Sequence, residues 1–212
     1  MNMNEGSYSQ AELRFLLPLA AGQRVGVVGD ARLLVEILML AKVSVISLDQ
    51  PLLHTGTVDF AMNLDHVMIP EFSCDTLDPC LARVIQWLKP GGGLLIGFHN
   101  SESLYRSHLE KDAGNKPRFS LQKCIRALEK NGIQIVCCYG AYDQLQNPRV
   151  LIPLDNKHAS EFYFRNLYLP LSLSRAWMLS ATILLSSIGL QRVLFHGFVI
   201  LAQREMRGNH AE

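Results

Sequence analysis

The stretch RVGVVGDARLLVEIL, residues 24–38, has the order of a buried strand, a tight turn and a helix. Residues 25–28 form an apolar run of strand length, and Gly29 can make the turn that follows. Residues 32–42 are apolar almost all round, which predicts a buried helix. In α/β proteins a nucleotide or nucleoside cofactor commonly lies at such a turn. This turn has one glycine, however, where cofactor loops usually have two or three.

Further apolar runs of strand length follow along the first two thirds of the chain. The predicted strands are residues 43–48, 58–64, 94–98 and 133–139. Between them, residues 77–88 have helical spacing, and Ser120 begins a helix that ends at Asn131 and Gly132. Strands that alternate with helices predict a parallel sheet with helices on both faces. The predicted fold class is therefore α/β, with a Rossmann-like, mostly parallel sheet.

The last third of the chain has a different composition. Residues 147–157 are irregular, residues 162–169 are dense in aromatic side chains, and residues 191–203 read as a closing strand. We interpret all 212 residues as one domain. Its expected parts are an N-terminal helical segment (1–20), a sheet core (21–141), an insertion (142–190) and the closing strand.

Residues 171–190 are strongly apolar, and Arg175 is their only charged residue. The run is about long enough to span a bilayer, but it contains five serines, Arg175 and Gly189. We therefore expect a lid helix, an interface with a second copy or a partner protein, or a membrane contact that is at most peripheral.

Overall composition excludes several classes of protein. The 20 basic and 19 acidic residues nearly cancel, which argues against a bulk electrostatic attraction to nucleic acid or to anionic lipid and leaves only a local charged patch open. The five cysteines include no CxxC pair, which predicts free thiols and a reducing, cytoplasmic location. No cluster of Cys and His has the spacing of metal ligands, so no metal site is expected. The N-terminus lacks a basic region followed by an apolar run, so no secretory signal is expected.

Residues 58–69 (VDFAMNLDHVMI) and 80–100 (CLARVIQWLKPGGGLLIGFHN) resemble class I S-adenosylmethionine-dependent methyltransferases. In that family this region holds the fourth strand, a helix, a KPGG turn and the fifth strand. FSLQKCIRALEKNGIQIV, residues 119–136, resembles the next helix and strand. The resemblance implies a seven-stranded sheet with an antiparallel last strand and a helical lid inserted before it. It also implies S-adenosylmethionine as the cofactor, across the carboxyl ends of the first, second and fourth strands.

The same resemblance implies which residues contact the cofactor at the first two strands. Gly29 matches the first glycine of the family's loop, and Val27 stands where the family has an acid. Asp30 would then bind the ammonium group in place of that acid. Asp49 ends the second strand and either binds the ribose hydroxyls or caps the turn before Pro51.

One departure from the family concerns the connection after the second strand. Residues 50–59 are too few for the helix, third strand and adenine-contacting loop that the family has there. The sequence therefore predicts that this unit is missing, and that the adenine lacks one wall unless a partner protein covers it.

The expected acceptor side lies after the fourth and fifth strands. Leu64 and Asp65 would complete the cofactor site, and His66 or His99 would act as the general base. Alternatively, Asp65 and His66 only cap or solvate the loop that leads to Pro70. The residues expected to line the acceptor side of the lid are Asn100, Phe162, Tyr163 and Tyr168.

Two functions remain open on the sequence. The first is an S-adenosylmethionine-dependent methyltransferase that acts on a small-molecule or lipid-like acceptor in biosynthesis. The second is a catalytically inactive protein of the same fold that serves as a binding or scaffolding subunit. The single glycine and the shortened connection favour the second function. Asp49, the KPGG turn and the complete lid favour the first.

Overall fold

The structure is a computed structural model that describes residues 13–29, 35, 38–39, 42–48, 62–104, 116–143, 145, 148–167 and 172–206. Its described strands are β1 (Arg24–Val28), β2 (Ser44–Leu48), β3 (Leu64–Ile69), β4 (Leu88–Asn100), β5 (Arg118–Phe119), β6 (Ile133–Asp143), β7 (Pro148–Pro153) and β8 (Gly197–Arg204). Its described helices are the 3₁₀ turns η1 (Leu13–Leu16) and η3 (Gln191–Leu194) and the α-helices α3 (Leu77–Trp87), α4 (Leu121–Lys130), α5 (Lys157–Leu167) and α6 (Leu173–Ser187).

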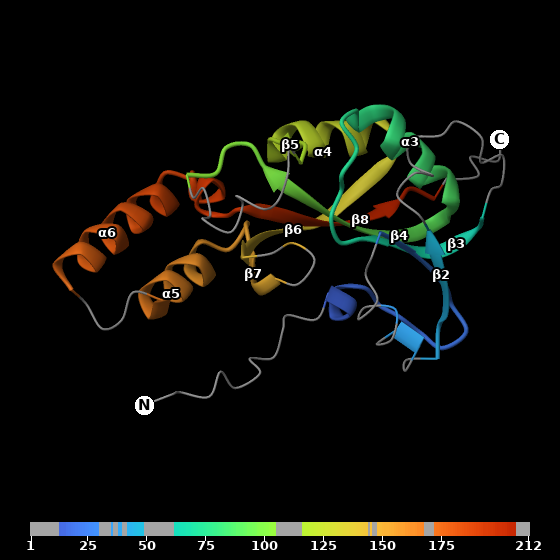
Figure 1. Cartoon of the computed structure of the whole chain (residues 1–212), viewed down its shortest axis with the longest axis horizontal. Coiled ribbons are helices and arrows are strands. Elements are labelled where there is room, and N and C mark those ends of the chain that lie inside the picture. Colours follow the sequence, from blue (N-terminus) through green and yellow to red (C-terminus); the bar gives the residue numbers. More distant parts are fainter. Residues whose placement is uncertain are drawn as a thin grey trace, which may run out of the picture.

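One mixed sheet runs through the molecule in the order β2-β1-β3-β4-β8-β6-β7, and the short β5 pairs with β4 (Figure 1). The pairs β1–β2, β1–β3, β3–β4 and β4–β5 are parallel, whereas β8 is antiparallel to both of its neighbours. The carboxyl ends of β1 to β4 therefore share one side of the sheet, which we call the carboxyl edge. This arrangement confirms the predicted α/β fold and its antiparallel last strand.

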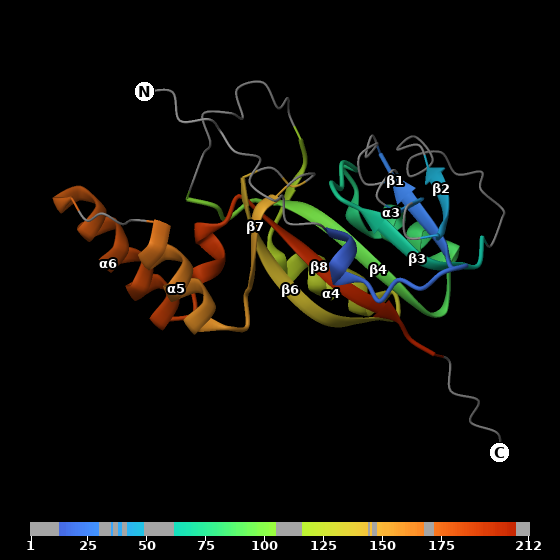
Figure 2. The same cartoon turned by 90° about the horizontal axis from the view of Figure 1, so that it is seen from below.

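Helices α3 and α4 cover one face of the sheet, and η1 lies against the other (Figures 1 and 2). Successive strand residues point to opposite faces, so each strand serves two cores. In β4, Leu94, Ile96 and Phe98 pack in the core beneath α3 and α4, whereas Leu95 packs in the core with Leu13 of η1. Both cores are closed, since all four β4 side chains are fully buried.

The insertion before β8 consists of β7, α5, α6 and η3, so the predicted helical lid is present. Figures 1 and 2 both place α5 and α6 beyond the carboxyl end of β4. A small core of its own holds the insertion together, with Ile152 of β7, Phe164 of α5 and Phe195 after η3. The prediction of an irregular segment at residues 147–157 was wrong, because β7 forms an antiparallel hairpin with β6.

Several predicted boundaries hold. The Ser120 hydroxyl accepts a hydrogen bond from the backbone N–H of Lys123 and so caps α4. Gly132 has φ +73° and makes the predicted left-handed exit. Helix α3 and strands β1, β2 and β4 lie where the apolar patterns placed them, although β4 and β6 are longer than expected.

Of the predicted strand at residues 58–64, residues 58–61 lie outside the described residues, and Met62 and Asn63 are not in a strand. Strand β3 begins at Leu64, because Asn63 before it has φ +47°, a left-handed conformation that a strand does not accommodate. The predicted helix at 32–42, the shortened connection at 50–59 and residues 1–12 of the N-terminal segment lie partly or wholly outside the described residues. The described sheet has eight strands instead of the implied seven.

Candidate functional site

Three polar side chains from different segments meet at the carboxyl edge. Glu71 follows β3, His99 is the penultimate residue of β4, and Lys116 precedes β5. One oxygen of Glu71, Oε1, lies 2.6 Å from His99 Nε2 and 2.5 Å from Lys116 Nζ. The carboxylate side chain is only 8% exposed, whereas 40% of the lysine side chain remains in contact with solvent. We call these three residues the carboxylate–histidine–lysine cluster.

Three phenylalanines anchor the backbone near the cluster. Phe72 follows Glu71, Phe98 precedes His99, and Phe119 ends β5. The three rings pack together, with centroids 5.1 Å apart for Phe72–Phe98 and 6.0 Å apart for Phe72–Phe119. Neighbouring residues of a strand point to opposite faces, so burying Phe98 leaves His99 on the other side of β4.

Gly97 brings the segment after β3 close to β4. A Cβ atom at Gly97 would lie 2.1 Å from the carbonyl oxygen of Pro70, so no other residue fits without a backbone shift. The Gly97 carbonyl also accepts a hydrogen bond from the backbone N–H of Phe72 at 2.8 Å. Glu71 lies between these two contacts, so its backbone is fixed on both sides.

The cluster holds Glu71 as a carboxylate. Burial by itself would raise the pKa of Glu71, but the hydrogen bonds and charges of His99 and Lys116 outweigh it and lower the pKa from 4.5 to about 2. An ionised carboxylate only accepts hydrogen bonds, so His99 Nε2 carries the proton of this contact. In the neutral ring Nδ1 is then the nitrogen that can take a proton.

The free energy of unfolding is expected to fall by about 2 kcal/mol between pH 6 and pH 3 through Glu71 alone. The pKa of Glu71 is lower in the folded state, so its stabilisation is complete above pH 4.5 and is lost as the pH falls toward 2. Urea unfolding across this range, compared with Glu71→Gln, measures the effect: the variant should lose less stability on acidification. Asp78→Asn removes a carboxylate from an exposed pair with Lys130 and serves as the control. If the free energy of unfolding falls equally with pH in the wild type and in Glu71→Gln, the prediction is contradicted.

Asp65 and His66 lie at the opposite, amino-terminal side of the sheet. Both belong to β3 itself, and His66 pairs in register with Val25 near the start of β1. The prediction that they follow the strand was therefore wrong, because the strand begins six residues later than expected. They lie at the start of β3, whereas Glu71 and His99 lie at the carboxyl edge.

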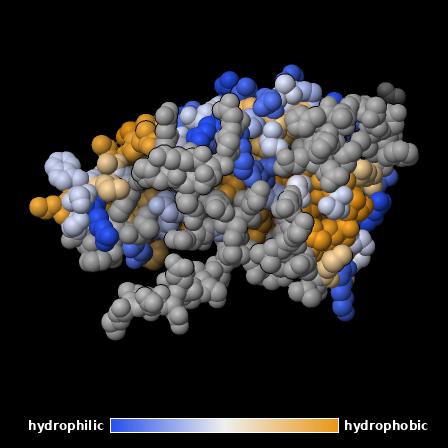
Figure 3. Space-filling model, viewed as in Figure 1, coloured by the Kyte–Doolittle hydropathy of each residue, from blue (hydrophilic) through white to orange (hydrophobic). Residues whose placement is uncertain are grey.

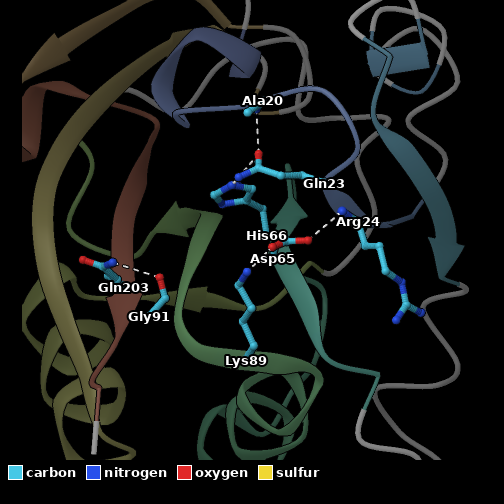
Figure 4. Close-up of polar contacts among 8 residues, drawn as sticks. All are labelled: Ala20, Gln23, Arg24, Asp65, His66, Lys89, Gly91 and Gln203. Carbon is cyan, nitrogen blue, oxygen red and sulfur yellow. Dashed lines mark hydrogen bonds and ion pairs between the residues drawn. The ribbon is translucent and has the colours of Figure 1, made fainter. Parts of the chain in front are cut away.

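Figure 4 shows how these two side chains connect segments of the chain. The Asp65 carboxylate accepts hydrogen bonds from the Arg24 backbone N–H and from the Lys89 ammonium group, and these contacts lower its pKa. His66 Nε2 donates to Gln23 Oε1 at 3.2 Å, and burial lowers the pKa of the ring, so it is neutral near pH 7. These contacts fasten the segment before β1 to β3 and β4.

Asn100 lies at the carboxyl edge, where its side chain forms hydrogen bonds with backbone groups of other residues. It is 2% exposed, and its Nδ2 donates to the carbonyl oxygens of Arg192 and Phe195 at 2.9 and 3.0 Å. Its Oδ1 accepts from the backbone N–H of Glu102. With all three contacts within the protein, Asn100 ties η3 to the end of β4.

The aromatic residues predicted for the lid have different surroundings. Tyr163 makes an edge contact with Tyr142, whose ring stacks on His196 at 5.7 Å near the carboxyl edge. Phe162, in contrast, is 72% exposed, so its ring lines no pocket in this structure. Tyr168 lies outside the described residues.

Of the predicted cofactor residues, Gly29 is at the carboxyl edge and has φ +95°. Its backbone N–H donates to the Leu48 carbonyl at 3.1 Å, which joins the ends of β1 and β2. Leu64 is fully buried in the core at the start of β3. Asp30 and Asp49 lie outside the described residues. Across the parts of the chain that are described, no three His, Cys, Asp or Glu side chains are placed to share a metal ion.

Sequence reasoning missed Glu71 and Lys116. The signal for Glu71 was its position directly after a strand and a proline, but it was hidden because the strand was placed six residues too early. Lys116 carries no local signal, because it lies 45 positions along the chain from Glu71 and the pairing of β5 with β4 brings them together.

No protein-family model matches the chain, and no curated protein matches its sequence. Many solved structures match its fold, among them the following three. A SAM-dependent methyltransferase from Archaeoglobus fulgidus is 18% identical with a TM-score of 0.52, over 90% of each chain. The candidate methyltransferase in complex with the Haloferax volcanii Trm112 methyltransferase activator is 15% identical with a TM-score of 0.53, over 92% of this chain and 89% of that one. A candidate sarcosine dimethylglycine methyltransferase from Galdieria sulphuraria is 10% identical with a TM-score of 0.50, over 92% and 83%.

Phosphoethanolamine N-methyltransferase 2 of Haemonchus contortus also matches, with 16% identity and a TM-score of 0.48. The match covers 92% of this chain but 51% of that protein, so the chain spans about half of its length.

Proposed function

We propose that this chain, whose fold is that of the class I S-adenosylmethionine-dependent methyltransferases, transfers a methyl group to a small-molecule or lipid-like acceptor in a biosynthetic step. The observation that carries the proposal is the carboxylate–histidine–lysine cluster at the carboxyl edge. In open α/β sheets this edge is where ligands bind. A buried carboxylate that orients a histidine is also a common arrangement for moving a proton.

The described residues at the end of β1 fit a cofactor. Val27 pairs in register with Met68, so Gly29 lies opposite Pro70, one residue before Glu71. With no side chain and a positive φ, Gly29 lets a ligand approach the backbone closely. S-Adenosylmethionine would be held there by Gly29, with Asp30 and Asp49 as further proposed contacts. When bound, it supplies an electrophilic methyl group.

His99 is the proposed general base. Its Nε2–H is held by Glu71, so its Nδ1 is the atom that takes a proton from an amine or hydroxyl of the acceptor. Lys116 shares the same carboxylate oxygen, so it offsets the negative charge of Glu71. Holding base and acceptor together supplies part of the rate enhancement by proximity.

The aromatic group near the carboxyl edge supports an acceptor with an apolar part. Tyr142, Tyr163 and His196 form adjoining ring contacts, and α5 and α6 extend beyond them. Aromatic side chains with a few polar groups are typical of small-molecule sites. The name of the Galdieria protein points to a small amine acceptor for that enzyme, which makes amines the first class to test here.

Saturating S-adenosylmethionine is expected to raise the Tm of the protein. At about 1 mM, a ligand with a Kd of about 10 μM adds about 2.7 kcal/mol, or roughly 5–11 °C for a chain of this size. Gly29→Ala should abolish the shift. Gly132→Ala is the matched control, because it also places alanine at a positive φ but lies at the end of α4. Release of S-adenosylhomocysteine with a panel of amine, hydroxyl and prenyl acceptors then identifies the acceptor class.

The alternative is a binding or scaffolding subunit of the same fold. Val27, which stands at the position of the family's acidic residue, is fully buried in the core with Leu13 and therefore contacts no ligand. If neither S-adenosylmethionine nor S-adenosylhomocysteine shifts the Tm, the enzyme proposal fails and this alternative is favoured. A partner protein would then co-purify with the chain. The Haloferax protein, which is in complex with an activator, makes such a partner a reasonable second target.

A further inference from the structure

Helix α6 turns its largest apolar side chains away from the protein. Leu173, Trp177, Leu184 and Ile188, which directly follows the helix, are 87%, 78%, 61% and 59% exposed. At about 100° per residue these four positions fall within roughly 60° of one another, so they form a single stripe along the helix. Figure 3 shows hydrophobic atoms on the surface at this end of the molecule. We call these four residues the outer stripe.

The inner face of α6 combines hydroxyl side chains with two leucines, Leu179 and Leu185, which are partly buried against the small core of the insertion. Its buried residues are Thr182 and Ser186, and Ser160 of α5 is also fully buried. The hydroxyl oxygens of Ser160 and Ser186 have no hydrogen-bond partner among the described residues. A helix that packs on a protein in water normally buries its large apolar residues and exposes its hydroxyls. Small residues between helices and large apolar residues outside are instead typical of helices in contact with lipid.

The net charge of α5 and α6 indicates which lipid head groups they would attract. Lys157, Arg165 and Arg175 outnumber the single acidic residue, Glu161, so α5 and α6 together carry a net charge of +2. Helix α6 contains no carboxylate. Lysine and arginine next to an apolar surface are attracted to anionic head groups. A second copy of the chain is the competing occupant of the outer stripe, and a measurement of dimer formation distinguishes it from a bilayer.

The length of α6 indicates how it would contact a bilayer. It has 15 residues, and among the described helices none is both long enough and apolar enough to cross a membrane. An exposed tryptophan within an apolar stripe is typical of helices that lie in the interface between head groups and acyl chains. We propose that α5 and α6 bind the surface of an anionic lipid bilayer through the outer stripe. This proposal stands whether or not the chain transfers methyl groups.

Co-sedimentation with vesicles tests the proposal directly. The wild-type chain should bind vesicles of phosphatidylserine and phosphatidylcholine, bind pure phosphatidylcholine more weakly, and lose affinity at high salt. Trp177→Glu should weaken binding to the anionic vesicles about tenfold or more, because it places a charge in the stripe. Val136→Glu, at an apolar position of β6 that is 59% exposed, is the matched control and should bind as wild type does.

Tryptophan fluorescence gives a second readout that does not depend on folding defects. The two tryptophans are Trp177 in the stripe and Trp87, which is 1% exposed in the core. Vesicles should shift the emission of Trp177 to shorter wavelength, and Trp177→Phe should remove that shift. Absence of binding by the wild type, or unchanged binding by Trp177→Glu, would overturn the proposal. So would a concentration-dependent dimer that Trp177→Glu abolishes in the absence of any vesicle binding.

Discussion

Replacing His99 by alanine is expected to lower kcat/KM for methyl transfer by a factor of about 10² to 10⁴, the usual contribution of a general base. His99 holds its ring 2.6 Å from the buried carboxylate of Glu71, which fixes both the tautomer and the orientation of the ring. Alanine leaves no group to accept the proton of the acceptor. The measurement is the rate of S-adenosylhomocysteine release with the acceptor that the panel identifies.

A histidine elsewhere in the sheet provides the control for this experiment. His66 is 6% exposed and its Nε2 also donates to a side chain, Gln23, but it lies at the start of β3. His66→Ala should therefore retain the activity of the fraction that folds. The Tm shift with S-adenosylmethionine should persist in His99→Ala, which separates loss of proton transfer from loss of cofactor binding. Equal losses in the two variants would mean that His99 has no special part in the reaction.

The second large effect concerns Gly97. Gly97→Ala is expected to lower the free energy of unfolding by more than about 3 kcal/mol, because the new methyl group meets a backbone carbonyl that cannot rotate away. That carbonyl belongs to Pro70, 2.1 Å from the position of the added Cβ. Relief of the clash requires the segment after β3 to move, which would also carry Glu71 away from His99. Urea unfolding measures the first consequence, and the rate of methyl transfer measures the second.

Gly132→Ala serves as the comparison for Gly97→Ala. An added Cβ at Gly132 meets nothing within 4 Å, so the cost there comes only from the positive φ and is about 1 kcal/mol. If Gly97→Ala lowers the free energy of unfolding no more than Gly132→Ala does, the backbone at Pro70 shifts without significant strain. The close approach would then not be what positions Glu71.

The types and order of most elements could be predicted because their signals are local. Apolar runs indicated β1, β2 and β4, and Ser120 marked the start of α4 through a contact with a residue three positions along the chain. The failures were local patterns that tertiary contacts overrode. Strand β3 begins only after Asn63, which is left-handed, and the segment that contains β7 became a strand by pairing with β6.

The candidate site was predictable only in part, since Asp65 and His66 were expected at the carboxyl edge and lie at the opposite side of the sheet. His99 was placed correctly because it directly follows residues 94–98, the apolar run within β4. Asp65 and His66 were placed at the wrong end because the start of β3 was misjudged. Asn100 was taken for a lid residue, but its amide is used by backbone groups of Arg192 and Phe195, more than 90 positions away.

The amino-acid sequence alone was enough to predict an α/β fold like that of the methyltransferases, because alternation of strands and helices is encoded over a few residues at a time. It also located Gly29 and His99, each at the end of a strand that its own composition defines. Which side chains surround His99 depended on the packed sheet. Glu71 and Lys116 reach it only because β3, β4 and β5 pair in one register and Gly97 admits the backbone at Pro70. Register is set by contacts between segments far apart in the chain, and no local pattern records it.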